Sequence, residues 1–332
     1  MTVETAQEQA QADSSRTGKD CNYFDFLAIA KSEVDQQTIA GLVEYRPGYV
    51  VLRTLRLAAA CIAIWAVALT QSLWFLILAV PLMVVVQQEM LIWVHEGAHR
   101  TLFRSKALND IWVSFWFASP LGVNFETYRL SHMSHHRRIA SADDGDRWTY
   151  ELYIRGGAFW RVVAKALLGF YGFSRALKKY ATGRYDRMRP DNTYPPTIRY
   201  LIIALLWNGA FLAASVAAGR WYVYLLLWLV PLFSFAILIT ILRTIAEHQP
   251  SDYEGRDPIT PVIRTTLCSR MERLFLFPLN FNFHIEHHMY PQVPFFNLPR
   301  LHSALTERGL YSRFPDALQR GALARVNELR RA

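Results

Sequence analysis

Cysteine is scarce in this chain, and so is charge. The three cysteines, Cys21, Cys61 and Cys268, stand far apart in the 332-residue sequence and form no C-x-x-C pair. This spacing argues against a disulfide framework, an iron–sulfur site and a zinc site built on thiolates. Only 19% of the residues are charged whereas 52% are hydrophobic, and the hydrophobic residues gather in long runs. The distribution indicates a membrane protein rather than a soluble protein with an oversized core.

The first twenty residues also lack the apolar stretch of a signal peptide, and their polar composition predicts a solvated tail. The formal net charge is +9, and the basic residues lie beside apolar segments. This arrangement favours contact with anionic lipid headgroups, or with an acidic group of a substrate, over contact with nucleic acid. We therefore expect a lipid bilayer and no nucleic acid among the partners.

Four apolar blocks approach the length of about 20 residues that a membrane-spanning helix needs. They cover residues 55–70, 73–94, 198–218 and 221–242. Two-residue connections join the first block to the second and the third to the fourth, which predicts two helical hairpins. Gln87, Gln88 and Glu89 interrupt the second block. Since polar groups that face lipid are costly, we expect these three side chains to face protein or a site.

Lysine and arginine are concentrated in the segment 95–197 and in the segment that begins at Arg243. The positive-inside rule therefore predicts that both segments and both termini are cytoplasmic. Residues 110–123 are apolar but too short to span, and they predict a re-entrant or interface-lying segment. Residues 156–180 mix aromatic and basic residues at helical spacing, which predicts a helix in the membrane interface. A solvent-facing helix of a cytosolic cap is the alternative.

Nine of the ten histidines fall in four short segments that follow a predicted hairpin or lie in a predicted cytoplasmic segment. The segments are HEGAH at 95–99, HMSHH at 132–136, the neighbourhood of residue 248, and HIEHH at 284–288. Residues three and four apart share a helix face, so each box would present its imidazoles together. The candidate metal ligands are His95, His99, His132, His135, His136, His248, His284, His287 and His288.

Nine imidazoles exceed what one ion takes, which is about four for zinc and about six for octahedral iron, so the pattern favours two metals. Imidazole suits zinc, copper, iron and nickel alike. HEGAH also matches the H-E-x-x-H pattern of zinc proteases, with Glu96 as the base, but that interpretation leaves seven histidines without a role. A metal transporter would need charged residues inside the spans, and three of the blocks have almost none. His302 stands outside the set and is interpreted as an ordinary core or surface residue.

The three boxes resemble those of the membrane fatty acid desaturase and hydroxylase superfamily. Residues 279–302, LNFNFHIEHHMYPQVPFFNLPRLH, are similar to the third-box region of bacterial and acyl-lipid desaturases. The resemblance runs from about Tyr45 to His302. It predicts a polar tail and lead-in at 1–44, a four-span desaturase-like domain with a cytosolic histidine-box cap at 45–302, and a cytosolic helical tail at 303–332.

The resemblance implies an all-α integral membrane protein in which two transmembrane hairpins carry a helical cap that holds a dimetal site. It implies two iron ions held by the nine histidines, dioxygen as co-substrate, and a long-chain fatty acid or an acyl thioester or lipid in a tunnel between spans and cap. Desaturation is the expected reaction, and the same superfamily includes hydroxylation and decarboxylation to a 1-alkene. No rubredoxin C-x-x-C and no His-Pro-Gly-Gly of cytochrome b5 is present. The electrons would come from a separate ferredoxin, rubredoxin or cytochrome b5 type donor with its reductase.

Two positions near the boxes bear on how the resemblance applies. The first box has three intervening residues, as in many bacterial and acyl-lipid members, where animal stearoyl-CoA desaturases have four. Thr244 stands where those animal enzymes have an asparagine four residues before the isolated histidine. Asn280 and Asn282 are candidate polar helpers near the third box, with local turn formation as the alternative.

Carboxylates close to the boxes are candidates to orient the imidazoles through the ring N–H groups that a metal leaves free. Glu247 and Glu286 are favoured because each adjoins a candidate ligand directly. The full set is Glu96, Glu247, Glu286, Asp143, Asp144 and Asp146. Five arginines are candidates to bind an anionic substrate head, with general headgroup contact as the alternative. They are Arg137, Arg138, Arg147, Arg187 and Arg189.

Overall fold

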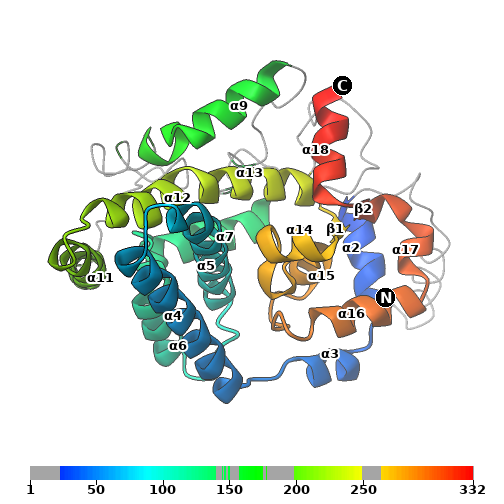
Figure 1. Cartoon of the computed structure of the whole chain (residues 1–332). Coiled ribbons are helices and arrows are strands. Elements are labelled where there is room, and N and C mark those ends of the chain that lie inside the picture. The colour runs from blue at the N-terminus through cyan, green and yellow to red at the C-terminus, as the bar shows by residue number, and fades with distance from the viewer. Residues whose placement is uncertain are drawn as a thin grey trace, which may run out of the picture.

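A computed structural model describes residues 23–139, 144, 146, 149, 157–174, 177, 198–248 and 263–331 of the chain. Four helical segments in it are long and apolar enough to cross a membrane: Pro47–Thr70, Phe75–Ala98, Ile198–Ala217 and Tyr224–Glu247. The first three are the helices α4, α5 and α11 (Figure 1). The predicted spans and the helical fold class are confirmed, although the second and fourth spans end four or five residues later than predicted.

The fourth span is a composite of a π-helical segment η2 (Tyr224–Leu229), α12 (Val230–Phe233) and α13 (Phe235–Glu247). It breaks at Ser234, whose backbone (φ −116°, ψ −77°) departs from the helix, while Pro231 lacks the N–H that would bond back to Leu227 in η2. After the break, α13 runs to Glu247, and His248 is its C-cap residue. The span thus connects the membrane segment to the histidine region.

The polar residues of the second span face protein, as predicted. Gln87 and Gln88 are buried and donate from their side-chain amides to the backbone oxygens of Trp228 and Ala236, each over 2.9 Å. Glu89 pairs with Arg53 of α4 at 3.3 Å. These contacts satisfy groups that would be costly in lipid, and they join α5 to the fourth span and to α4.

The apolar segment 110–123 forms the end of α6 (Lys106–Val113) and the π-helical segment η1 (Ser114–Ala118). It packs on α5 at Gly97, in the middle of the first box. A Cβ at Gly97 would lie 2.3 Å from Cγ2 of Val113, so only glycine permits this approach. The position of the segment relative to a membrane surface stays a prediction.

The predicted amphipathic stretch 156–180 begins with a helix, α9 (Gly157–Leu167). Val162 and Ala166 pack against Ile241 and Ile245 of α13, while Trp160 on another face is exposed. Figure 1 shows α9 lying along α13. Residues 156, 175, 176 and 178–180 lie outside the described part, and the interfacial location stays a prediction.

The remaining elements form a helical region at the end of α5 and α13 (Figure 1). In chain order they are α2 (Tyr23–Ser32), α3 (Gln36–Leu42), α7 (Phe125–Arg138), β1 (Thr265–Leu267), α14 (Arg270–Phe275), η3 (Pro278–Asn280), α15 (His284–Met289), α16 (Leu298–Glu307), α17 (Leu310–Arg313), η4 (Pro315–Ala317), β2 (Leu318–Arg320) and α18 (Ala322–Arg331). Among the described residues the one sheet is the parallel pair β1–β2. It ties the end of the chain to the segment before the third box.

The first and last described segments meet in this region. The rings of Phe26 in α2 and Phe314 lie 5.1 Å apart, and Arg313 pairs with Glu33. Helix α16 crosses the predicted boundary between residues 302 and 303. The division into segments 1–44, 45–302 and 303–332 stays a prediction.

Candidate metal centre

The structure brings all nine predicted histidines together in two groups. The first is His95, His99, His132, His136 and His287, and the second is His135, His248, His284 and His288. Within each group, one ligand atom of every residue lies within 4.8 Å of the others. The five-histidine group and the four-histidine group are each large enough to hold one metal ion.

Each H-x-x-H-H box divides between the two groups. In α7, His132 and His136 belong to the five-histidine group while His135 belongs to the other. In α15, His284 and His288 belong to the four-histidine group while His287 belongs to the five-histidine group. The first and fifth residues of each box are four apart and share one helix face. The fourth residue turns toward the neighbouring group, so both helices serve both sites.

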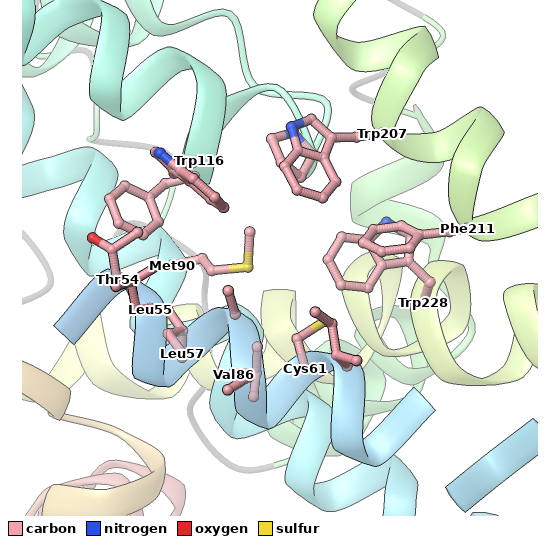
Figure 2. A pocket seen from close by; sticks show the side chains of 15 residues that line it. Thr54, Leu55, Leu57, Cys61, Val86, Met90, Trp116, Trp207, Phe211 and Trp228 are labelled. Carbon is pink, nitrogen blue, oxygen red and sulfur yellow. The ribbon is translucent and has the colours of Figure 1, made fainter. Parts of the chain in front are cut away.

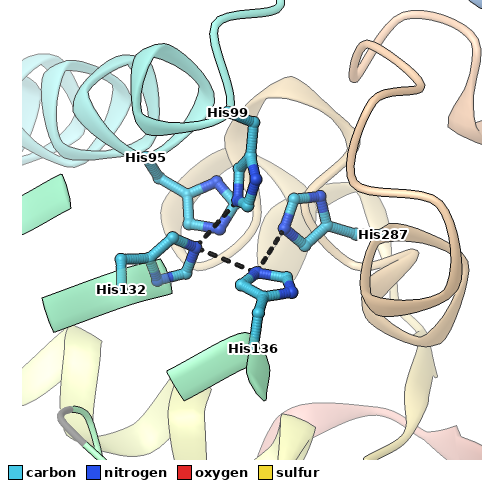
Figure 3. A group of neighbouring side chains, drawn as sticks. All are labelled: His95, His99, His132, His136 and His287. Atoms are coloured by element: carbon cyan, nitrogen blue, oxygen red, sulfur yellow. Dashed lines mark hydrogen bonds between the residues drawn. The ribbon is translucent and has the colours of Figure 1, made fainter. Parts of the chain in front are cut away.

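The nitrogen spacing in the five-histidine group is that of neighbouring ligands on one ion (Figure 3). Nε2 of His132 lies 2.9 Å from Nε2 of His99 and 3.0 Å from Nε2 of His136. Nε2 of His136 lies 3.2 Å from Nε2 of His287. Two nitrogens bound at about 2.1 Å and at right angles are about 3.0 Å apart. Neither ring nitrogen of buried His95 finds a hydrogen-bond partner among the described residues. The donor set therefore fits a metal.

The four-histidine group has the same spacing. Nε2 of His284 lies 3.0 Å from Nε2 of His248 and 3.2 Å from Nε2 of His288. His135 joins them through ring contacts, with its centroid 5.0 Å from those of His248 and His288. This group also fits one ion.

Burial keeps most of these imidazoles neutral, as metal binding requires. The pKa of His287 lies well below its usual value because the ring is buried and because His132 is close. Burial and the neighbouring imidazoles likewise depress the pKa values of His99, His136 and His288. His135 is the exception. Burial lowers its pKa, but the hydrogen bond to Asp144 and nearby carboxylates raise it above the usual value.

Carboxylates stand behind one histidine in each group. Nδ1 of His135 lies 2.8 Å from Oδ1 of Asp144, whose side chain is fully buried. Nδ1 of His132 lies 3.1 Å from Oδ2 of Asp146, which is 28% exposed. Such contacts set the ring orientation and the tautomer that presents Nε2 to a metal. Asp143 of the predicted set lies outside the described residues.

Two further carboxylates of the predicted set approach Nδ1 atoms from longer range. Glu96 Oε1 lies 3.4 Å from Nδ1 of His95, while its Oε2 accepts from the backbone N–H of Phe295 at 3.3 Å. Glu247 Oε1 lies 4.0 Å from Nδ1 of His284 and 3.9 Å from Arg243. Glu96 therefore connects the first box to the loop after the third.

The favoured interpretation of Glu286 as a carboxylate that orients a neighbouring ligand is wrong. Its oxygens contact Thr265, His302 and Tyr311, on the side of α15 away from the histidine groups. The adjacency in sequence misled because neighbouring helical residues point about 100° apart. His302, interpreted as an ordinary core or surface residue, has a half-buried ring whose partner is Glu286 of the third box.

The three polar residues singled out near the boxes bond to the backbone. Thr244 donates to the oxygen of Thr240 at 2.8 Å, one turn earlier in its own helix. Asn280 and Asn282 donate to backbone oxygens of Phe295 and Thr266. Asn280 has a φ of 58°, so local turn formation accounts for it.

Of the candidate head-binding arginines, Arg137 and Arg138 are exposed at the end of α7. Arg147, Arg187 and Arg189 lie outside the described residues. Arg243 is not among the predicted residues, yet its guanidinium lies 4.2 Å over the ring of Phe281. That ring in turn lies 4.5 Å from His95. No motif distinguishes this arginine, so no sequence signal could have found it.

A cavity of about 410 Å³ lies between α4, α5, η1, α11 and η2 (Figure 2). Its wall is almost wholly apolar, with Met90 of α5, Trp116 of η1 and Phe211 of α11 among the lining residues. Both π-helical segments contribute, through Trp116 and Trp228. Met90 stands five residues before His95, which is about 8 Å along the helix axis. The cavity thus opens among the spans close to the first box.

Fold and site together define an integral membrane protein with a histidine-rich centre, whose two groups of imidazoles could each hold a metal ion. The family model for fatty acid desaturases matches residues 71–316, and the chain belongs to that family. Membership indicates an oxidoreductase, and the family is bound to membranes.

Similarity to individual relatives is low but extensive. The chain is 25% identical over 280 residues to a dihydrorhizobitoxine desaturase of Bradyrhizobium elkanii, covering 80% of this chain and 75% of that protein. It is 24% identical over 226 residues to an sn-1 oleoyl-lipid 12-desaturase of Synechocystis sp., covering 64% of this chain and 63% of that protein. It is 22% identical over 229 residues to a chloroplastic omega-6 fatty acid desaturase of Glycine max, covering 64% and 52%. The chain thus spans less than two thirds of the last two relatives.

Proposed function

We propose that the protein is an O2-dependent non-haem diiron enzyme that desaturates a long-chain fatty acyl substrate with electrons from a separate donor. The observation that carries the proposal is the division of nine buried or half-buried histidines into groups of five and four on shared helices. In the proposal the nine histidines are the iron ligands. Because α7 and α15 supply ligands to both groups, two bound ions would be held at a constant separation. Oxidative chemistry on two metals needs such a separation, whereas a zinc protease needs only one ion.

A bound diiron centre, with dioxygen and electrons, supplies an oxidant strong enough to remove hydrogen from an unactivated C–H bond. The protein's own residues orient the imidazoles and exclude water from the centre. Asp144 and Asp146 hold His135 and His132 through Nδ1. Phe281, packed 4.5 Å from His95 and 5.3 Å from His284, covers both histidine groups with an apolar ring and excludes water there.

The apolar cavity supports a hydrocarbon substrate. We propose that it receives the tail of the acyl chain, because its wall offers an alkyl chain dispersion contact and almost no polar partner. The exposed Arg137 and Arg138 are proposed to meet an anionic head at the end of α7. A free acid, an acyl thioester and a lipid share this combination of apolar tail and polar head.

We place the metal centre and both termini on the cytoplasmic side. The support is the excess of Lys and Arg in 95–197 and from Arg243 onward, set against the two short loops between spans. A cytoplasmic centre would be within reach of a ferredoxin, rubredoxin or cytochrome b5 type donor and its reductase.

The test is turnover of a labelled fatty acid by the purified protein in a bilayer disc, with ferrous iron, a reductant and oxygen. We expect an internal alkene of unchanged chain length. A hydroxy acid, or a terminal alkene one carbon shorter, would assign one of the other reactions of the superfamily. His287→Ala should abolish turnover, and one zinc per chain in active protein would overturn the diiron proposal.

A further inference from the structure

Glu286 lies in the middle of HIEHH, yet its side chain points away from both histidine groups. An α-helix turns about 100° per residue, so His287 and His288 lie within about 60° of His284 around the axis of α15. Glu286 lies about 200° from His284, on the opposite side. The side chain is fully buried there. A buried carboxylate is stable only where donors surround it.

Three donors from three elements surround this carboxylate. Nδ1 of His302 in α16 lies 2.5 Å from Oε1, and the hydroxyl of Tyr311 in α17 donates to the same oxygen. The hydroxyl of Thr265 in β1 donates to Oε2 and accepts the backbone N–H of Ile285 at 3.3 Å. The ring of His302 is held between Phe283 and Tyr311, with both centroids 4.9 Å away. Both oxygens of the Glu286 carboxylate therefore have hydrogen-bond donors within this cluster.

Helix α15 needs such support because it has only six residues. A helix that short has little stability of its own, so tertiary contacts must set its rotation. It also supplies ligands to both groups: His287 to the five-histidine group, and His284 with His288 to the four-histidine group. A small rotation of α15 would therefore disturb both sites together.

We propose that Glu286, Thr265, His302 and Tyr311 form a positioning lock that sets the rotation of α15 and thereby places the third-box imidazoles of both metal sites. The inference rests on the proposed function in that it takes the histidines as metal ligands. None of the four residues would touch metal or substrate. The lock also gives the C-terminal segment a role, since Tyr311 lies beyond the third box and α16.

The experiment compares Tyr311→Phe and His302→Gln with Tyr200→Phe, each in the full chain. Tyr200 is a matched control because it is equally buried and donates its hydroxyl to a backbone oxygen, that of Gly122, at 2.6 Å. The measurements are iron bound per chain at defined free iron, the Mössbauer spectrum of the iron-57 form, and the thermal midpoint of the metal-free protein. Glu286→Gln is added as the conservative variant.

We expect Tyr311→Phe to weaken binding of both irons roughly tenfold and to change both Mössbauer components, because a hydrogen bond to a charged group is lost. The midpoint of its metal-free form should stay near that of Tyr200→Phe, which should bind iron as the wild type does. His302→Gln and Glu286→Gln should change the same two components. Should Tyr311→Phe fail to fold, His302→Gln decides, since that side chain is 18% exposed.

A wild-type spectrum and wild-type iron binding in these variants would overturn the lock, as would a change confined to one site. Failure of the wild-type protein to bind two irons would instead overturn the proposed function, so the two failures are distinguishable.

Discussion

Asp144 offers the sharpest test of the two-site arrangement. Its Oδ1 lies 2.8 Å from Nδ1 of His135 and also accepts the backbone N–H of Asp146 at 2.9 Å. Asp144→Asn keeps the shape of the side chain but removes the charge that favours a proton on Nδ1. The imidazole then loses its preference for the tautomer that presents Nε2 to the metal.

The size of the effect follows from burial. Loss of a carboxylate behind a metal-binding histidine costs about 10–100-fold in affinity. The Asp144 side chain is fully buried, so water does not compensate and we expect the upper end, about 100-fold or about 2.8 kcal/mol. Asp146 is 28% exposed and its contact is longer, 3.1 Å, so Asp146→Asn should cost about tenfold.

The two aspartates should also act on different sites. Asp144 supports His135 of the four-histidine group, and Asp146 supports His132 of the five-histidine group. The assay is a competition titration of the two irons against a ferrous chelator. Asp110→Asn is the control, because Asp110 is about as exposed as Asp146 (32% against 28%) but pairs with Arg100 at 2.7 Å instead of with a histidine.

Double variants assign the site. Asp144→Asn should be non-additive with His288→Ala, which removes a ligand of the same group, and additive with His287→Ala. The reasoning is refuted if Asp144→Asn binds both irons like the wild type. It is equally refuted if the coupling appears with His287 instead of His288.

Three further outcomes follow from the same structure. Gly97→Ala should lower turnover more than tenfold and reduce iron content, because the new Cβ would lie 2.3 Å from Cγ2 of Val113 and must displace the helix end that carries the first box. Val113→Ala in the same chain should restore part of the loss, and an absence of rescue would contradict this packing. Ala58→Phe, which places a ring in the 410 Å³ cavity, should shift the preferred substrate to shorter chains in a competition assay, whereas an unchanged preference would remove the cavity from the acyl site. The metal-free protein should lose stability as the pH falls below about 6.5, since burial holds the pKa values of His99 and His136 well below that value and the unfolded chain then takes up protons at these residues that the folded chain does not. Thermal midpoints at pH 6.5 and 5 measure this, and a midpoint that rises between them on acidification would contradict it.

Local pattern was enough for the spans and for the candidate ligands. Hydropathy is a property of each segment alone, so the four apolar blocks predicted the four helices, although the first helix begins at Pro47, eight residues before the predicted start. The positions of Gln87 and Gln88 inside an apolar block likewise predicted that they face protein, because lipid offers no partner. The number and spacing of the histidines predicted two metals without reference to any contact.

Which histidine joins which group was decided only by the tertiary structure. The spacing of the histidines predicts that each box presents its imidazoles on one shared face. In the structure each box does present its imidazoles on one broad face, but that face borders both groups, so His135 and His287 belong to the neighbouring group. The two groups adjoin, with the rings of His136 and His288 only 4.1 Å apart. Spacing along the chain predicts the direction of a side chain around its helix, but it does not predict which other segment that side chain meets.

The supporting residues divide in the same way. Sequence adjacency favoured Glu286 as a partner of the ligands, whereas the partner of His135 proved to be Asp144, nine residues away. Glu286 instead contacts residues of α16, α17 and β1. Its partners His302 and Tyr311 stand 16 and 25 residues later in the chain, and Thr265 stands 21 residues earlier. The sequence by itself thus determined that this protein has four helices able to cross a membrane and that its imidazoles are concentrated in a few short segments at the ends of these helices or beyond them. Only the packing of distant segments decided how those imidazoles are shared and held, because hydrogen bonds act over about 3 Å in space, whatever the separation along the chain.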